Sequence, residues 1–158
     1  MNKIELLQVI VLEMEKSLII AQRSTQRAIE SATDEETVPE HKYDTLALEA
    51  SYLAHGQAMR AEECERELSQ MKQLSIPTNM EHVALGCLVC LLDDSDECQW
   101  FFIAPCAGGL KVDYQQQQVM VVTLASPLGK AIKGKSIGDD VDYQVGQTNF
   151  SYQIDTII

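Results

Sequence analysis

The feature that most constrains this chain of 158 residues is a long repeat of apolar and small residues at its amino-terminal end. Such side chains recur at alternating spacings of three and four, with no Gly or Pro between them. The positions are Ile4, Leu7, Val11, Met14, Leu18, Ala21, Thr25, Ala28 and Ala32. This spacing is typical of a coiled-coil seam and predicts one long helix. A buried amphipathic helix of a globular bundle is the alternative.

A second seam follows, and it predicts a partner helix. Its positions are Tyr43, Ala47, Ala50, Ala54, Gln57, Ala61, Cys64, Leu68 and Met71. Thr37 and Glu40 fit a capping box, with Pro39 in the first turn, where its missing N–H costs nothing. Antiparallel pairing of the seams puts Ala21 beside Ala50 and centres the turn near residue 36. The sequence therefore predicts an antiparallel helical hairpin over residues 1–75.

The turn of this hairpin, near residues 34–44, is rich in acids. Large seam residues lie at the base and mostly Ala or Thr toward the turn, which predicts a slender end that fits into a partner. The acids near this tip are Asp34, Glu35, Glu36, Glu40 and Asp44. One interpretation is a solvated turn whose carboxylates favour the start of the second helix. The other is a Mg²⁺ site that is completed by ligands from a partner.

Residues 76–158 show the pattern of short strands. Pro77 ends the helical pattern, and several apolar runs separated by turns follow from Val83. Ser126-Pro127 begins a short helix that Gly134 closes. The segments VDYQV and FSYQIDTII look like a closing hairpin. The expected fold class is thus α+β, with a small antiparallel sheet and one short helix after the hairpin.

Charge and cysteine content exclude several classes of function. A net charge of −12 disfavours direct binding to a phosphate backbone. Glutamates interrupt the first apolar run, so neither a signal peptide nor a membrane span is expected. An odd count of five cysteines argues against a disulfide scaffold and predicts a reducing, cytoplasmic location. Cys87 and Cys90 are interpreted as buried apolar thiols, and Trp100, Phe101 and Phe102 as core residues; no metal site belonging to the chain is expected.

Two stretches of the sequence resemble the bacterial Gre transcript cleavage factors, the GreA/GreB family. ASPLGKAIKGKSIGDDV followed by SYQIDTI resembles the carboxy-terminal signature of the family. LEASYLAHGQAMRAEECERELSQMKQL resembles its second stalk helix, with Ala50-Ser51-Tyr52 where the family has an Ala-acid-Tyr step. The resemblance spans nearly the whole chain and indicates a divergent subgroup.

The resemblance implies a coiled-coil hairpin followed by an FKBP-like domain. It also implies an accessory, non-enzymatic elongation factor that binds RNA polymerase at the secondary channel. The motif expected to dock on the polymerase is Ser126, Pro127, Leu128 and Gly129. Two tip acids would help to hold a Mg²⁺ shared with the polymerase for cleavage of backtracked RNA, with no tightly bound cofactor. The protein is then expected to be a cytoplasmic monomer that meets nucleic acid only through the polymerase.

One departure from the family pattern leaves the mechanism open. Aligning Ala50-Ser51-Tyr52 with the family step puts the two acid positions at Thr45 and Leu48, which cannot ligate Mg²⁺. Either another acid pair acts, or the protein occupies the channel and regulates or inhibits the polymerase without cleavage. Two further alternatives are an FKBP-type peptidyl-prolyl isomerase and a scaffold that dimerises through the Ile10 and Ile19 side of the first helix.

Overall fold

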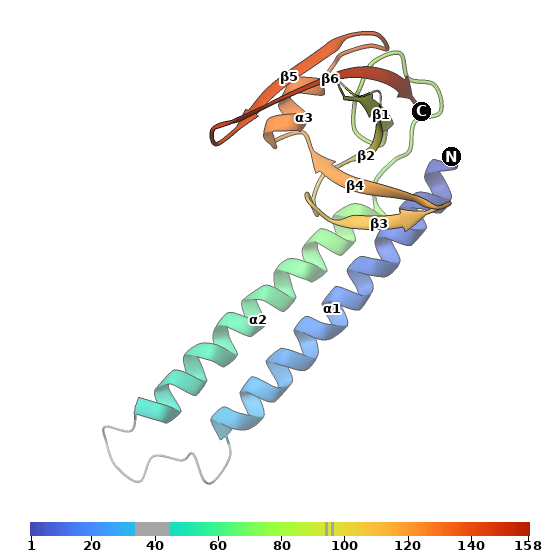
Figure 1. The fold of residues 1–158 in the computed structure, drawn as a ribbon. Coiled ribbons are helices and arrows are strands. Elements are labelled where there is room, and N and C mark those ends of the chain that lie inside the picture. The colour runs from blue at the N-terminus through green and yellow to red at the C-terminus, as the bar shows by residue number, and fades with distance from the viewer. Residues whose placement is uncertain (34–44, 94, 96) are drawn as a thin grey trace. The chain divides into compact units, whose positions relative to one another are not determined.

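The computed structural model describes residues 1–33, 45–93, 95 and 97–158, and of Leu46 and Ala47 only the backbone. The elements follow the order α1 (Lys3–Thr33), α2 (Thr45–Lys72), β1 (Leu88–Leu92), β2 (Cys98–Ala104), β3 (Lys111–Tyr114), β4 (Gln117–Thr123), α3 (Pro127–Ile132), β5 (Asp140–Val145) and β6 (Thr148–Ile157), as Figure 1 shows. They form two compact units: Leu12–Ser69, and Met1–Val11 with Gln70–Ile158. The predicted α+β class is confirmed.

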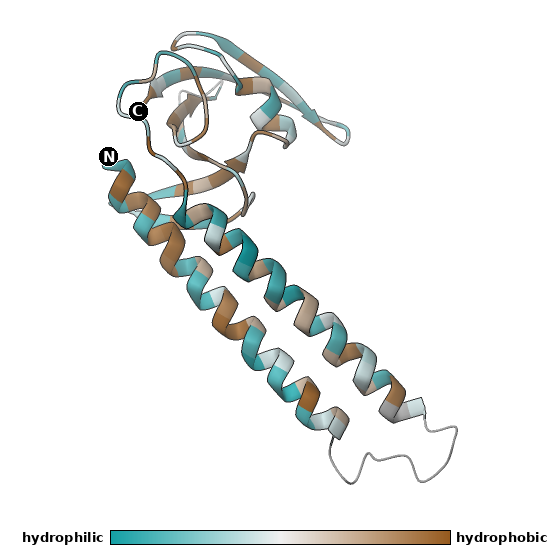
Figure 2. Ribbon diagram, turned by 180° about the vertical axis from the view of Figure 1, so that it is seen from behind, coloured by the Kyte–Doolittle hydropathy of each residue, from teal (hydrophilic) through white to brown (hydrophobic). Residues whose placement is uncertain are grey.

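The described part of the unit Leu12–Ser69 contains α1 from Leu12 onward and α2 as far as Ser69, side by side and antiparallel (Figure 1). Among the side chains of this unit that the structure describes, the buried apolar ones all belong to the predicted seams: Met14, Ala21, Ala28, Ala61 and Leu68. Figure 2 shows brown, apolar positions recurring along α1, whereas α2 is mostly teal or pale. Because an Ala buries much less apolar area than a Leu, the seam stabilises this unit weakly where it is built from Ala.

The predicted register of the two helices is wrong. Pairing Ala21 with Ala50 would place Gln22 near Glu49, but its side-chain amide donates a 3.0 Å hydrogen bond to Glu65 Oε1. A seam of this kind repeats every seven residues, so small Ala side chains fit equally well in several registers. The turn centred near residue 36 was predicted from this register. That turn and the capping box at Thr37 both lie outside the described residues.

The base of α1 departs from the seam. Ile4, an expected seam residue, is 61% exposed, whereas Lys3, Leu6 and Ile10 are buried. Residues 1–11 belong to the compact unit that contains the sheet, so this part of α1 buries a neighbouring face of the helix. Side chains three and four apart share a helix face, which explains why these three are buried together.

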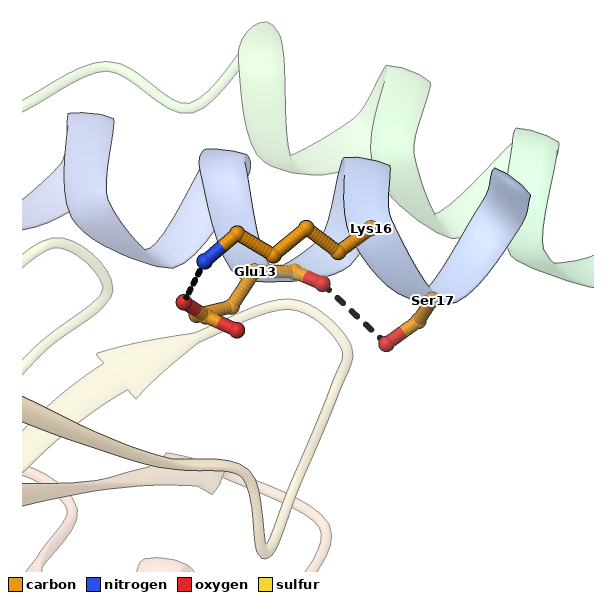
Figure 3. A network of polar contacts seen from close by, with 3 residues as sticks. All are labelled: Glu13, Lys16 and Ser17. Carbon is orange, nitrogen blue, oxygen red and sulfur yellow. Dashed lines mark hydrogen bonds and ion pairs between the residues drawn. The ribbon is translucent and has the colours of Figure 1, made fainter. Parts of the chain in front are cut away.

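A polar surface, in contrast to this buried face, lies slightly further along α1, at Glu13. Lys16 Nζ lies 2.5 Å from Glu13 Oε1, and Ser17 Oγ donates to the carbonyl oxygen of Glu13 at 3.1 Å (Figure 3). The side chain of Lys16 is 57% exposed and that of Glu13 is 39% exposed. Exposed ion pairs of this kind contribute at most about 1 kcal/mol. This face is therefore solvated and adds little to the stability of the hairpin.

The other unit contains a six-stranded sheet in the order β3-β4-β2-β1-β6-β5. The expectation of an entirely antiparallel sheet is wrong at one pair, because β2 and β4 are parallel. The cause is β3, which runs opposite to β2. β4 reverses direction again, so it is parallel to β2 on one side and antiparallel to β3 on the other. The main core cluster consists of Val83, Cys87, Val89, Leu91, Phe101, Ile103, Val122, Leu128, Ile132, Val141 and Ile154.

The cysteines confirm the expected burial but not the expected absence of a disulfide. Cys87 and Cys90 are buried, as predicted. Cys90 is nevertheless joined to Cys98 in a disulfide, which the odd cysteine count argued against. Strand pairing explains the contact: Leu92 lies opposite Cys98, so Cys90 is a diagonal neighbour of Cys98 on the same face of the sheet. In the described ranges, no helix is long and apolar enough to cross a membrane.

Candidate functional site

The segment Ser126–Gly129, expected to contact a partner, forms the start of α3. Ser126 is extended, with φ −68° and ψ 160°, and caps the helix. Its hydroxyl oxygen accepts a 3.0 Å hydrogen bond from Gly129 N–H, and its hydroxyl donates to the carbonyl oxygen of Thr123 at 2.8 Å. Pro127 occupies the first helical position, where its fixed φ suits the helix. The predicted Ser-Pro start of a short helix is confirmed.

At position 129 the backbone of β4 lies so close that only a glycine fits. A Cβ atom added at Gly129 would lie 2.0 Å from the carbonyl oxygen of Thr123. Leu128 is buried beside it, while Pro127 is exposed. The end of β4 and the first turn of α3 therefore pack closely, and the segment presents Pro127 to solvent from a fixed backbone.

A cleft of about 480 Å³ opens beside this segment. Its lining residues come from β2, β4, α3, the β5–β6 hairpin and the turn before β3: Gln99, Phe101, Gly108, Gly109, Met120, Val121, Val122, Thr123, Ser126, Pro127, Leu128, Tyr143, Val145, Phe150 and Tyr152. No charged side chain is among them in the described part of the chain. The cleft is thus apolar, with a few polar groups, in a chain whose net charge is −12.

Three aromatic rings of the β5–β6 hairpin stack beside one another in this cleft. The Tyr143 and Phe150 ring centroids are 5.0 Å apart with planes inclined by 12°, and Tyr143 and Tyr152 are 6.1 Å apart at 14°. Tyr143 lies directly opposite Phe150 in the strand register. Burial, together with the neighbouring Tyr152, raises the pKa of Tyr143 to about 12. The tyrosine hydroxyl therefore stays protonated and neutral at ordinary pH.

The sequence interpretation missed this aromatic group. It expected Trp100, Phe101 and Phe102 to fill the core, and Phe101 and Phe102 are indeed buried, but Phe101 also lines the cleft. The available signal was the alternation of Phe150 and Tyr152, because residues two apart on a strand lie on one face. Tyr143 joins that face only through the pairing of β5 with β6.

The first turn of α1 is attached within the sheet-containing unit at two points. Lys3 Nζ donates a 2.5 Å hydrogen bond to the carbonyl oxygen of Pro77, and Tyr114 Oη donates to Glu5 Oε2 at 2.6 Å. Burial lowers the pKa of Lys3 below its usual value. Unpaired buried charges are costly, so the Pro77 carbonyl compensates part of the cost of burying this ammonium group.

The proposed metal-holding acids cannot be placed. Asp34, Glu35, Glu36, Glu40 and Asp44 all lie outside the described residues. The two positions that the family pattern would choose, Thr45 and Leu48, begin α2, and both are exposed. Elsewhere in the described ranges, no three His, Cys, Asp or Glu side chains come together in a group that could hold a metal ion.

A family model and two curated proteins match about half of this chain. Residues 77–158 match the family model described as transcription elongation factor, GreA/GreB, C-terminal. Transcription elongation factor GreA of Rickettsia felis is 31% identical over 77 residues, covering 49% of this chain and 44% of that protein. GreA of Rickettsia conorii matches to the same extent. The aligned part of the chain thus spans less than half the length of these curated relatives.

Among solved structures, similarity extends over more of the chain. The GreA factor homolog 1 (Gfh1) protein of Thermus thermophilus is 20% identical, with a TM-score of 0.39 and 94% of each chain covered. A GreA/GreB elongation factor from Nitrosomonas europaea is 15% identical, with a TM-score of 0.37, covering 60% of this chain and 78% of that chain. The family assignment rests on the sequence match instead, because that match covers more than half of the chain. The chain belongs to the GreA/GreB family of transcription elongation factors.

Proposed function

We propose that this protein is an accessory factor that binds RNA polymerase at its secondary channel and modulates elongation without a catalytic site of its own. The observation that carries the proposal is the family match over residues 77–158. The antiparallel hairpin of α1 and α2 and the acids between these helices support it. The factor acts as a cytoplasmic monomer and meets nucleic acid only through the polymerase. In that reducing compartment we expect the Cys90–Cys98 disulfide of the structure to be reduced to two thiols.

Docking on the polymerase is assigned to Ser126, Pro127, Leu128 and Gly129. The rigid backbone at Gly129 and the exposed Pro127 support this assignment. Pro127→Glu tests it, because an acidic residue is tolerated in the first turn of a helix and so changes the surface without unfolding α3. The matched control is Gln147→Glu, the same added charge at an exposed turn residue. We expect the first variant alone to lose binding to core polymerase in a pull-down; equal binding by both would refute the assignment.

The acidic tip is proposed to act at the polymerase active site, sharing a Mg²⁺ held by the polymerase. A metal of this kind activates water for phosphodiester hydrolysis, and a carboxylate pair from the factor would complete its coordination. The second candidate function is a regulator that occupies the channel without cleavage. The exposed Thr45 and Leu48 favour this candidate, since neither side chain supplies a carboxylate.

RNA cleavage in stalled, backtracked complexes separates the two candidates. The test variant carries Asp34, Glu35, Glu36, Glu40 and Asp44 changed to Ala. The control carries Glu62→Ala and Glu63→Ala, which removes exposed acids from α2 away from the tip. Cleavage by the wild type that is lost only in the tip variant supports metal sharing. Polymerase binding with slowed elongation and no cleavage selects the channel-occupying regulator, and absence of binding overturns both.

A further inference from the structure

We propose that the cleft beside α3 binds an extended, uncharged peptide segment that contains proline, with the ring packed on the aromatic stack of Tyr143, Phe150 and Tyr152. The cleft shares Ser126, Pro127 and Leu128 with the segment assigned to polymerase docking. The peptide binding itself needs no RNA polymerase, so it goes beyond the proposed function of the chain. The proposal concerns binding alone. It differs from the peptidyl-prolyl isomerase alternative, which requires catalysis as well as binding.

The size of the cleft suits such a segment. Its volume of about 480 Å³ lies within the range of roughly 300–1,000 Å³ that ligand pockets occupy. Its walls come from strands and α3, whose first turn is fixed by the Ser126 cap and by the close approach at Gly129. A pocket that is formed before binding loses little conformational entropy when a ligand enters.

The aromatic stack selects the kind of side chain that packs there. The three rings are nearly parallel and stacked, with angles of 12° and 14°, so they form one partly exposed apolar wall along the β5–β6 hairpin. Aromatic-lined grooves recognise proline-rich segments because the proline ring packs on flat rings and the chain is already extended. Val145 and Leu128 flank the stack and provide further apolar contacts.

The charge of the cleft excludes charged ligands. The described lining residues bear no formal charge, so an acidic or basic side chain entering the cleft would lose hydration without gaining a partner. The chain as a whole, at −12, also repels acidic segments. The exposed side-chain amide of Gln99, at the edge of the cleft, can donate a hydrogen bond to a peptide carbonyl. This combination favours a neutral peptide backbone with proline among small apolar residues.

The test is a titration of the ¹⁵N-labelled full chain with a capped Ala-Leu-Pro-Leu-Ala peptide, followed by NMR. We expect saturable shifts confined to the amides around the cleft, in β2, the turn before β3, β4, α3 and the β5–β6 hairpin. The matched peptide with Ala in place of Pro should bind at least about tenfold more weakly. No saturable shift at millimolar peptide, or equal binding of the two peptides, would overturn the proposal.

Two variants connect the binding to the cleft. Val145→Asp places a charge at a cleft residue that is 51% exposed, so it should abolish binding while the chain stays folded. Tyr143→Leu removes the central ring of the stack and should weaken binding about tenfold. Tyr52→Leu, at an exposed position of α2, is the control and should bind as the wild type does. Unchanged binding in Val145→Asp would refute the cleft as the site, whatever the polymerase experiments show.

Discussion

The hydroxyl of Tyr114, at the end of β3, donates a 2.6 Å hydrogen bond to the carboxylate of Glu5 in the first turn of α1. The side-chain amide of Gln115 in turn donates to the same hydroxyl at 3.1 Å. The bond to Glu5 is also the main cause that raises the pKa of Tyr114. Residues 109 positions apart in sequence are thus joined inside one compact unit.

Tyr114→Phe should lower the free energy of unfolding, because a hydrogen bond to a charged carboxylate contributes more to stability than one between neutral groups. Urea denaturation measures the change, and hydrogen exchange should speed up in the first turns of α1. Tyr52→Phe removes a hydroxyl from a tyrosine that is 68% exposed and serves as control. An equal effect of the two variants would show that the Glu5 contact adds nothing to stability.

Gly129→Ala should destabilise the sheet-containing unit by about 1–3 kcal/mol, the usual cost of overpacking. The added Cβ would lie 2.0 Å from a backbone oxygen, so β4 and α3 would have to move apart. Thermal unfolding followed by near-UV circular dichroism measures the loss. If the melting temperature is unchanged, the close approach at this residue is not needed for stability.

Gly56→Ala, in contrast, should increase stability. Gly56 lies in α2, is exposed, and an added Cβ there meets nothing within 4 Å. Replacing a mid-helix glycine by alanine stabilises a helix by roughly 0.5–1 kcal/mol. Far-UV circular dichroism during heating should show a later loss of helix, and an earlier loss would indicate backbone strain at this position.

The local patterns of the sequence predicted much of this fold. The seam residues Ala21 and Ala28 are buried, the Ser126 cap forms, and the closing hairpin of β5 and β6 appears where alternation placed it. Each of these depends on residues close together in the chain. Spacing, capping and turn chemistry act at that range, so one sequence suffices to find them.

Long-range pairing was not predictable in the same way. The parallel pair of β2 and β4, the Tyr114–Glu5 bond and the Gln22–Glu65 bond all depend on which distant segments meet. For the helices, an Ala-rich seam fits several registers about equally well. For the candidate site, Pro127 was found from a local motif, whereas Tyr143 entered the cleft through strand pairing.

A pair of engineered cysteines can test the helix register. Because Gln22 bonds to Glu65, we expect buried Ala21 to lie closer to buried Ala61 than to Ala50. In a Cys64→Ser background, Ala21→Cys with Ala61→Cys should form a disulfide rapidly under mild oxidation. Ala21→Cys with Ala50→Cys, the pair expected from the sequence, should not, because disulfides need Cα atoms within roughly 7 Å. Faster cross-linking of the second pair, measured by mass spectrometry, would restore the sequence register.

The stability of the sheet-containing unit should fall in alkaline solution because of Tyr143. Its pKa is raised to about 12, chiefly by burial, whereas an unfolded tyrosine titrates near 10. The unfolded chain therefore releases this proton first. Stability from this group is complete below about pH 10 and is lost as pH rises through about 12.

Tyr143→Phe should reduce the decline in the free energy of unfolding that urea denaturation measures between these pH values. Tyr114 titrates in the same direction, so part of the decline should remain. The exposed Tyr52→Phe control should decline as the wild type does, and an identical slope in the Tyr143 variant would contradict the assignment.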